Sequence, residues 1–176
     1  MIFFTSDTHF YHKNVIRYSN RPFSSVEEMN EALIEKWNST VSVKDEVYHL
    51  GDVSFSSLGN TLSILDRLNG RKKLILGNHD RTLSKKSDFK SRFEWIKDYY
   101  LLKVNDPDAP DGVQQIVLFH YALRTWEKIH YGSWNLFGHS HGTLPDNIYL
   151  KAMDVGVDCN NYKPISYERV KDIMRV

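Results

Sequence analysis

The chain has 176 residues, which suits one domain with a sizeable core, and we expect residues 1–176 to form a single domain. Its 23 lysine and arginine residues nearly balance its 22 aspartate and glutamate residues, so a net charge of +1 excludes a general attraction to nucleic acid or to an anionic membrane. The single cysteine, Cys159, excludes an internal disulfide and a thiolate metal cluster, and we expect it to be buried and inert.

The N-terminal segment begins with the apolar residues 2–4 but has no charged region before them, and Asp7 interrupts the apolar stretch. This pattern is not that of an export signal. No stretch approaches the ~18 apolar residues that cross a bilayer. We therefore expect a cytoplasmic protein with no membrane partner.

Short apolar runs recur along the chain and predict buried strands at residues 2–4, 47–50, 74–76, 116–119 and 135–137. A helix is predicted between the first two runs, because Ser25 and Glu28 have the spacing of a capping box. The apolar side chains that follow lie on one helical face: Val26, Met29, Leu33 and Trp37.

The second predicted helix carries a stripe of Leu62, Leu65 and Leu68 and is stopped by Asn69 and Gly70. Residues 71–73, with the sequence RKK, are expected to form a solvated turn, and residues 103–112 a turn or loop between two neighbouring strands. The segment 165–176 predicts a C-terminal helix capped by Ser166. This alternation of strands and helices indicates α/β architecture.

Polar motifs follow five of the predicted strands. In α/β sheets, ligands bind beyond the carboxyl ends of the strands, so we expect these side chains to gather at one edge. Oxygen and nitrogen donors without sulfur suit Mn, Fe, Zn or Ni. The side chains concerned are Asp7, His9, Asp52, Asn78, His79, His120, His139 and His141.

The ordered motifs DTH, GD, GNHD, FH and GHSH resemble those of the calcineurin-like metallophosphoesterase superfamily, whose pattern is DxH, GD, GNH(D/E), a lone H and GHxH. The resemblance runs from Asp7 to His141 and is greatest to the small bacterial and phage members that lack a cap domain. It implies a four-layer αββα sandwich in which two mixed β-sheets are flanked by helices.

The resemblance also implies a site for two divalent transition-metal ions, with manganese expected and nickel, iron or zinc as alternatives. Its pattern assigns one ion to Asp7, His9, Asp52 and His141. It assigns the other to Asp52, Asn78, His120 and His139, so that Asp52 bridges the two.

The activity implied is hydrolysis of phosphoesters, with in-line attack on phosphorus by a hydroxide that bridges the metals. His79 is not a ligand in the family pattern, and the histidine at its position contacts the substrate and protonates the leaving oxygen. Asp80 is expected to orient His79.

Several other side chains have two interpretations each. His12 and Arg124 either contact the substrate or lie on the surface. His49 is expected in the core and His130 on the surface. The aromatic residues that either stack on a nucleobase or pack in the core are Trp126, Tyr131 and Trp134.

The motif that begins at Gly51 restricts the substrate. Protein phosphatases of the superfamily extend it to GDxVDRG, whereas this chain reads GDVSFSS and lacks the aspartate and the arginine. We therefore expect a small soluble phosphodiester or phosphomonoester, such as a nucleotide. The alternatives are a nuclease or RNA-end-processing phosphoesterase, with nucleic acid as substrate, and a non-catalytic scaffold of the same fold.

Overall fold

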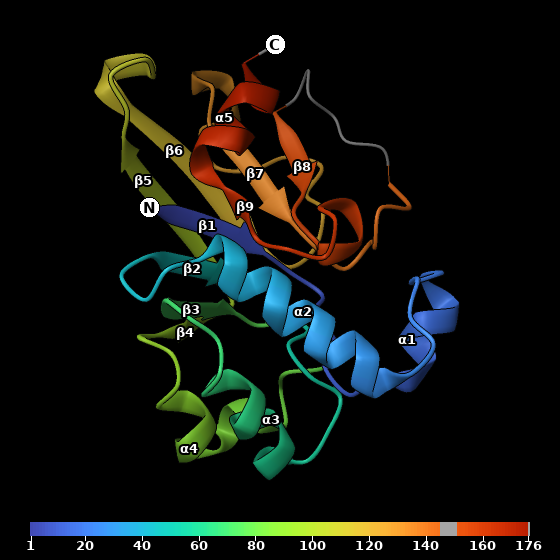
Figure 1. Ribbon diagram of the computed structural model, residues 1–176. Helices are drawn as coiled ribbons and strands as arrows, with labels where there is room; N and C mark the ends of the chain where they lie inside the picture. Colours follow the sequence, from blue (N-terminus) through green and yellow to red (C-terminus); the bar gives the residue numbers. More distant parts are fainter. Residues whose placement is uncertain (145–150, 176) are drawn as a thin grey trace.

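The computed structural model describes residues 1–144 and 151–175, which form two mixed β-sheets packed face to face (Figure 1). The first sheet has the order β4-β3-β2-β1-β9, and the second has the order β5-β6-β7-β8. The strands of the first sheet are β1 (Ile2–Thr5), β2 (Glu46–His49), β3 (Arg71–Ile75), β4 (Ile96–Lys97) and β9 (Ile165–Ser166). Those of the second are β5 (Tyr99–Asn105), β6 (Val113–Phe119), β7 (Trp134–Phe137) and β8 (Ala152–Asp154).

The parallel strands bring the strand ends together. β1, β2, β3 and β4 run parallel, and in their register Thr5 pairs with His49 and His49 pairs with Leu74. In the second sheet β6, β7 and β8 are also parallel, whereas β5 and β9 are antiparallel to their neighbours. A bridge between Ser6 and Gly156 joins the chain just after β1 to the chain just after β8. The carboxyl ends of both sheets therefore meet at one edge.

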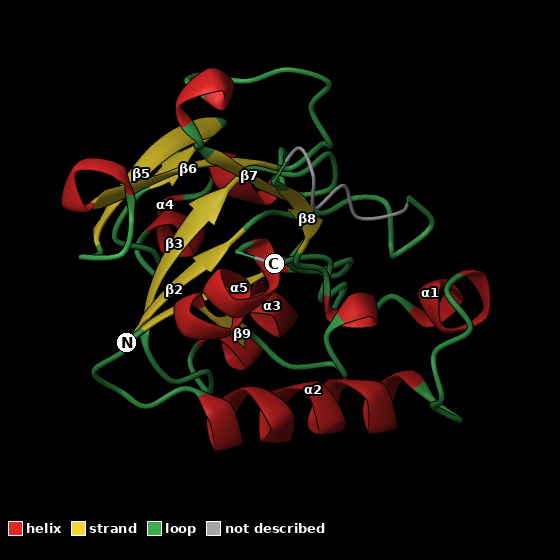
Figure 2. Ribbon diagram, turned by 90° about the horizontal axis from the view of Figure 1, so that it is seen from above, coloured by secondary structure: helices red, strands yellow, loops and turns green. Residues whose placement is uncertain are grey.

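Five α-helices are described: α1 (Lys13–Tyr18), α2 (Val26–Thr40), α3 (Leu58–Leu65), α4 (Ser87–Lys90) and α5 (Tyr167–Met174). Helices α2, α3 and α4 cover the outer face of the first sheet, and Figure 2 shows α2 running along that side. In the part of the chain that the structure describes, none of the helices has the length and apolar character needed to cross a membrane.

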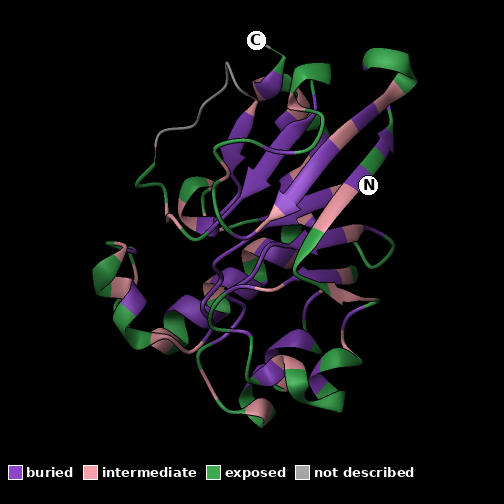
Figure 3. Ribbon diagram, turned by 180° about the vertical axis from the view of Figure 1, so that it is seen from behind, coloured by how far each residue is buried: buried purple, intermediate pink, exposed green. Residues whose placement is uncertain are grey.

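The core between the sheets is formed by alternate side chains of both, because successive residues of a strand point to opposite faces. Figure 3 shows the strands as mostly buried. Helix α5 closes this core, with Tyr167 stacked on Trp134. On the outer face of the second sheet, Val117 and Phe137 pack against Trp126 in the segment that follows β6. The apolar side chains between the sheets include Phe4, Leu50, Ile75, Leu102, Ile116, Leu118 and Leu136.

The structure confirms the predicted fold class of two mixed sheets flanked by helices. Helix α2 begins after Ser25, whose hydroxyl accepts a hydrogen bond from the backbone N–H of Glu28 at 3.1 Å. A capping box also predicts a hydrogen bond from the backbone N–H of Ser25 to the Glu28 side chain. This part of the prediction is wrong, because the Glu28 carboxylate accepts from the backbone N–H of Ser24 instead, at 2.7 Å. The predicted apolar face is confirmed for Met29, Leu33 and Trp37, which are buried.

The prediction for the second helix is partly wrong. Helix α3 ends at Leu65, so Leu68 lies beyond it, and Leu62 is only half-buried while Ile64 is buried. The expected helical stripe therefore includes a residue of the following turn, which reaches the same core from a non-helical backbone.

Residues 71–73 form the first part of β3, so the expected solvated turn is wrong. The ammonium group of Lys73 is taken up by two carboxylates, at 2.7 Å from Glu46 and 3.0 Å from Glu94, which permits its burial in a strand. Residues 103–105 end β5, so the connection between β5 and β6 is shorter than predicted and includes a 3-10 turn, η2 (Pro110–Gly112).

The C-terminal helix begins as predicted, because the Ser166 hydroxyl accepts a hydrogen bond from the backbone N–H of Arg169 at 3.2 Å. It ends at Met174, and Val176, which the prediction included, lies outside the described residues. The prediction that Cys159 is buried is wrong. It ends the 3-10 turn η4 (Val157–Cys159), in which Val157 faces the core and Cys159 is exposed.

Candidate metal centre

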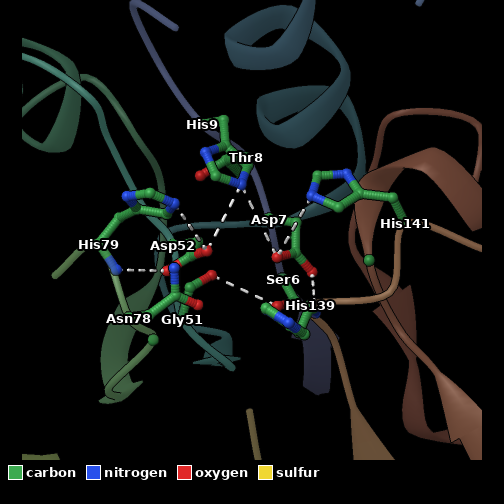
Figure 4. Close-up of polar contacts among 12 residues, drawn as sticks. Ser6, Asp7, Thr8, His9, Gly51, Asp52, Asn78, His79, His139 and His141 are labelled. Carbon is green, nitrogen blue, oxygen red and sulfur yellow. Dashed lines mark hydrogen bonds and ion pairs between the residues drawn. The ribbon is translucent and has the colours of Figure 1, made fainter. Parts of the chain in front are cut away.

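Two groups of ligand atoms lie side by side at the shared edge of the sheets. Asp7, His9 and His141 form the first group, and the ligand atoms within it lie within 4.8 Å of one another. The same holds for a second group, which contains Asp52, His120 and His139. Figure 4 shows the imidazoles of His9, His79 and His141 around the carboxylates of Asp7 and Asp52.

The backbone bends sharply at the strand ends to bring these side chains together. Five of the six grouped residues have a positive φ: Asp7 (56°), His9 (48°), Asp52 (59°), His139 (66°) and His141 (48°). Such a backbone costs on the order of 1–3 kcal/mol per non-glycine residue, although aspartate and histidine adopt it more readily than most. The concentration of strained residues in the ligand set is typical of a functional site.

Two glycines of the motifs leave room for the carboxylates. A Cβ atom at Gly77 would lie 2.2 Å from Asp52 Oδ1, and one at Gly138 would lie 2.4 Å from Asp7 Oδ2. No side chain fits at such distances without moving a carboxylate. The glycines in GNHD and GHSH are therefore required by the positions of Asp52 and Asp7.

Asp52 lies between the two groups. Its Oδ2 atom is 3.5 Å from His9 Nε2, in the first group, and 3.5 Å from His120 Nε2, in its own. Burial alone would raise the pKa of Asp52, but the adjacent His120 ring and the hydrogen bond from the backbone N–H of His79 together hold the pKa below its ordinary value. The side chain is thus an ionised carboxylate placed to serve both groups.

Asp7 and His9 each bury a polar atom that has no hydrogen-bond partner among the described residues, Oδ1 of Asp7 and Nε2 of His9. Burial raises the pKa of Asp7 to about 7 and lowers the pKa of His9 to about 2. An unpaired buried polar atom is costly, and a divalent cation would satisfy both atoms at once. These donors therefore fit a bound metal ion.

The second group also has the donors that a transition metal takes. His120 Nδ1 lies 2.6 Å from the carbonyl oxygen of Leu50, and a carbonyl only accepts, so we assign the proton to Nδ1. Nε2 is then free to act as a ligand, and it lies 3.2 Å from Asn78 Oδ1. The structure thus places the amide of Asn78 beside His120 of the second group, at the position that the family resemblance implies.

His141 is held by two residues that the sequence analysis missed. Its Nδ1 atom lies 2.7 Å from Asp158 Oδ2, and both oxygens of that carboxylate accept from the Arg21 guanidinium at 2.8 Å. Arg21 also donates to the carbonyl oxygens of Asp7 and Thr8. This buried chain fixes the ring of His141 so that Nε2 faces Asp7, at 3.9 Å from Oδ1. No local motif marks Arg21 or Asp158, because their partners lie far along the chain.

His79 and His12 lie at the rim of the two groups. His79 Nε2 is 4.0 Å from Asp52 Oδ2, and 36% of its side chain is exposed, so a substrate can reach it. His12 Nδ1 is 3.2 Å from His9 Nδ1.

The prediction that Asp80 orients His79 is wrong. The buried Asp80 carboxylate accepts hydrogen bonds from the backbone N–H groups of Asp52, Val53 and Gly77, at 2.8 to 3.0 Å. It stabilises the loop that carries Asp52.

The remaining candidates are not members of the two ligand groups. His49 is buried, with Nε2 3.0 Å from the Thr8 hydroxyl, and His130 is exposed, as the sequence predicts. Trp134 is buried between the sheets and Trp126 is buried on the outer face of the second sheet, whereas Tyr131 is 80% exposed. Arg124 is exposed, and within the described residues no hydrogen bond or ion pair joins it to the ligand groups, so its substrate contact stays a prediction.

A sandwich of two mixed sheets with carboxylates and imidazoles clustered at one edge defines a metal-binding α/β protein. The profile of the calcineurin-like phosphoesterase family matches residues 1–160. The chain therefore belongs to this family, which supports metal-dependent hydrolysis of phosphoesters as its class of reaction.

Relatives of similar length are found in archaea, phages and bacteria. An uncharacterized protein of Methanocaldococcus jannaschii is 36% identical over 96% of this chain and 88% of its own. The gene 66 protein of Mycobacterium phage L5 is 28% identical over 88% of this chain and 85% of its own. The crystal structure of a protein of unknown function from Aquifex aeolicus superimposes with a TM-score of 0.72 at 26% identity, over 98% of both chains.

Proposed function

We propose that the protein is a phosphoester hydrolase that depends on two divalent transition-metal ions. The observation that carries this proposal is the pair of donor groups on either side of Asp52, together with the unpaired buried atoms of Asp7 and His9. A scaffold without bound metal would have no evident use for a buried, unpaired carboxylate oxygen, which is costly to maintain.

Asp7, His9, Asp52 and His141 would hold one ion, and Asp52, Asn78, His120 and His139 would hold the other. Manganese is the ion we expect, and nickel, iron or zinc would also suit these oxygen and nitrogen donors. When bound, the two ions supply positive charge to the phosphoryl oxygens and lower the pKa of a water molecule, which becomes the nucleophile.

The side chains of the protein position the donor groups, supply a proton and contact the substrate. Asp52 and Asp7 fix the positions of the two donor groups through their contacts with the backbone N–H groups of His79 and His139. His79 donates a proton from its ring to the leaving oxygen. His12, beside His9 at the rim, contacts a non-bridging oxygen of the substrate, and Arg124 is a further candidate for that role.

The substrate we propose is a small phosphodiester or phosphomonoester that reaches the open edge of the sheets. Residues 51–57 lack the aspartate and arginine of the protein-phosphatase motif, so no arginine of this segment selects a dianionic phosphate. The near-neutral chain offers no general attraction to nucleic acid. Nuclease activity is therefore the alternative function, and hydrolysis of short RNA in the assay below would reveal it.

A panel of esters tests this function. We expect bis(p-nitrophenyl) phosphate to be hydrolysed at least as fast as p-nitrophenyl phosphate, in the presence of Mn²⁺ or Ni²⁺ and not after chelation. Linear dinucleotides, cyclic nucleotides and short RNA would complete the panel, each assayed with Mn²⁺, Ni²⁺, Zn²⁺ and Mg²⁺. Rapid turnover of the monoester with no cleavage of any diester would show a dedicated phosphatase instead.

Replacement of Asp158 should weaken the binding of one metal ion. We expect Asp158→Ala to lower the affinity of the site that contains His141 by ~10–100-fold, because the ring loses the group that fixes its orientation and tautomer. Titration of the metal-free protein with Mn²⁺, followed by calorimetry, would measure this. The affinity of the second site serves as the internal control, and equal weakening at both sites would show that Asp158 acts only through general stability.

A further inference from the structure

A hollow of about 310 Å³ lies beside His79 and outside the two ligand groups. It shares His79 with the candidate metal centre, since the ring nitrogen of that residue is 4.0 Å from Asp52 Oδ2. A group bound there would adjoin the residue that we assign as the proton donor. The hollow is lined by Ser54, Phe55, Ser56, His79, Thr82 and Leu83.

The wall of the hollow is an aromatic ring held in place although 53% of Phe55 is exposed. The Phe55 ring stacks on His12, with 4.4 Å between centroids and 22° between planes. It also meets His79 edge to face, at 5.3 Å and 78°. Its backbone N–H donates to the carbonyl oxygen of Phe10 at 2.8 Å. These contacts hold the ring of Phe55 in one position beside His79 while part of it stays open to solvent.

The lining of the hollow is neutral apart from His79. Phe55 and Leu83 are apolar, and the others, Ser54, Ser56 and Thr82, carry only hydroxyl groups. Phe55 and Ser56 stand where the protein-phosphatase motif GDxVDRG has its aspartate and arginine. The hollow therefore has no fixed cation for a phosphate, and its volume is at the lower end of the range for small-molecule sites.

We propose that this hollow binds the leaving group of the substrate and selects one with a planar aromatic ring, such as an aryl or nucleoside alcohol. The ring packs on Phe55, and the ester oxygen of the leaving group, which is attached to the ring in an aryl ester and to the ribose in a nucleoside ester, then lies on the side of His79, where it receives the proton. The proposal rests on the proposed function and narrows it to esters with an aromatic leaving group.

The test compares two phosphodiesters whose leaving groups have matched pKa values, one an aryl alcohol and the other a fluorinated alkyl alcohol. We expect Phe55→Ala to lower kcat/KM for the aryl ester by ~10–100-fold, the loss typical of one aromatic stacking partner, mainly through KM. The alkyl ester should lose less than ~3-fold, since an aliphatic group forfeits only ordinary contact with the ring. Phe55→Tyr keeps the ring and should restore the preference.

Tyr131→Ala is the matched control, because it also removes an exposed aromatic ring but lies in the 3-10 turn η3 (Ile129–Tyr131) on the other sheet. Equal losses for both esters in Phe55→Ala would overturn the proposal and show that Phe55 only supports His12 and His79. Loss of the aryl preference in Tyr131→Ala alone would also overturn it.

If the wild-type protein cleaves neither ester, the proposed function is wrong. A binding experiment then still tests whether the hollow selects an aromatic ring. In that case the metal-loaded protein would be titrated with the phenyl and the isopropyl monoester of methylphosphonic acid. Tighter binding of the phenyl ester that Phe55→Ala abolishes would support the proposal, and equal binding would overturn it.

Discussion

Asp52→Asn should lower phosphoester hydrolysis by ~10³-fold or more, and by more than any single histidine replacement. The carboxylate oxygen Oδ2 lies 3.5 Å from a histidine of each donor group, so the variant weakens both metal sites rather than one. A tenfold change in rate corresponds to about 1.4 kcal/mol, and loss of a metal ion removes several kcal/mol of charge stabilisation. Steady-state rates with a saturating diester would measure the loss.

The asparagine variant should remain folded, because asparagine tolerates the positive φ of 59° at this position and its amide oxygen still accepts from the His79 N–H. His139→Ala gives the comparison for loss of a ligand from one group only. Asp172→Asn, on the exposed side of α5, controls for the removal of a carboxylate elsewhere. An Asp52→Asn variant that binds two ions and matches His139→Ala in rate would refute the shared role of Asp52.

His79→Ala should slow the cleavage of esters with alkoxide leaving groups by ~10²–10⁴-fold, the usual contribution of a positioned proton donor. Esters of p-nitrophenol should lose much less, since the phenolate departs without a proton. The backbone N–H of residue 79, which donates to Asp52 Oδ1 at 2.9 Å, is retained in the alanine variant, so both metal sites should stay intact. A series of leaving groups of increasing pKa would measure the dependence.

Metal analysis of the same variant separates the alternatives. His130→Ala removes an exposed histidine from η3 and should leave the rates unchanged. If His79→Ala loses metal, His79 is a ligand, and if all leaving groups suffer equally, it anchors the phosphoryl group. Either result would remove the assignment of His79 as the general acid.

The α/β class and the donors at the strand ends were predictable because their signals are local, whereas the arrangement in two sheets was implied only by the resemblance to the phosphoesterase family. An apolar run of three or four residues marks five of the strands, β1, β2, β3, β6 and β7, and a polar motif such as DTH or GHSH follows the run. The strands β4, β8 and β9 were not predicted, because each has two or three residues and is fixed by its neighbours in the sheet. No range was predicted for β5 either, because its exposed residues interrupt the apolar run. Residues 71–73 were predicted to form a turn because charged residues are typical of the surface. The ion pairs of Lys73 with Glu46 and Glu94 allow it to be buried in β3.

The contacts that orient the ligand side chains could not be predicted from the sequence. Arg21 and Asp158 are 137 residues apart, and each is an ordinary surface residue type that only tertiary contacts bury. Phe55 looked like one apolar residue among serines, and its packing on His12 and His79 depends on the loops that meet at the sheet edge. Local patterns thus predict the donors, whereas the residues that orient them follow from the topology.

The measurement that tests the central claim most directly is a titration of metal-free protein with Mn²⁺, in which bound metal per chain and hydrolysis of bis(p-nitrophenyl) phosphate are followed together. The account predicts two bound ions per chain, with hydrolysis absent before the titration and complete only when both are bound. Full hydrolysis by the protein before any metal is added, or saturation at a single ion, would contradict it.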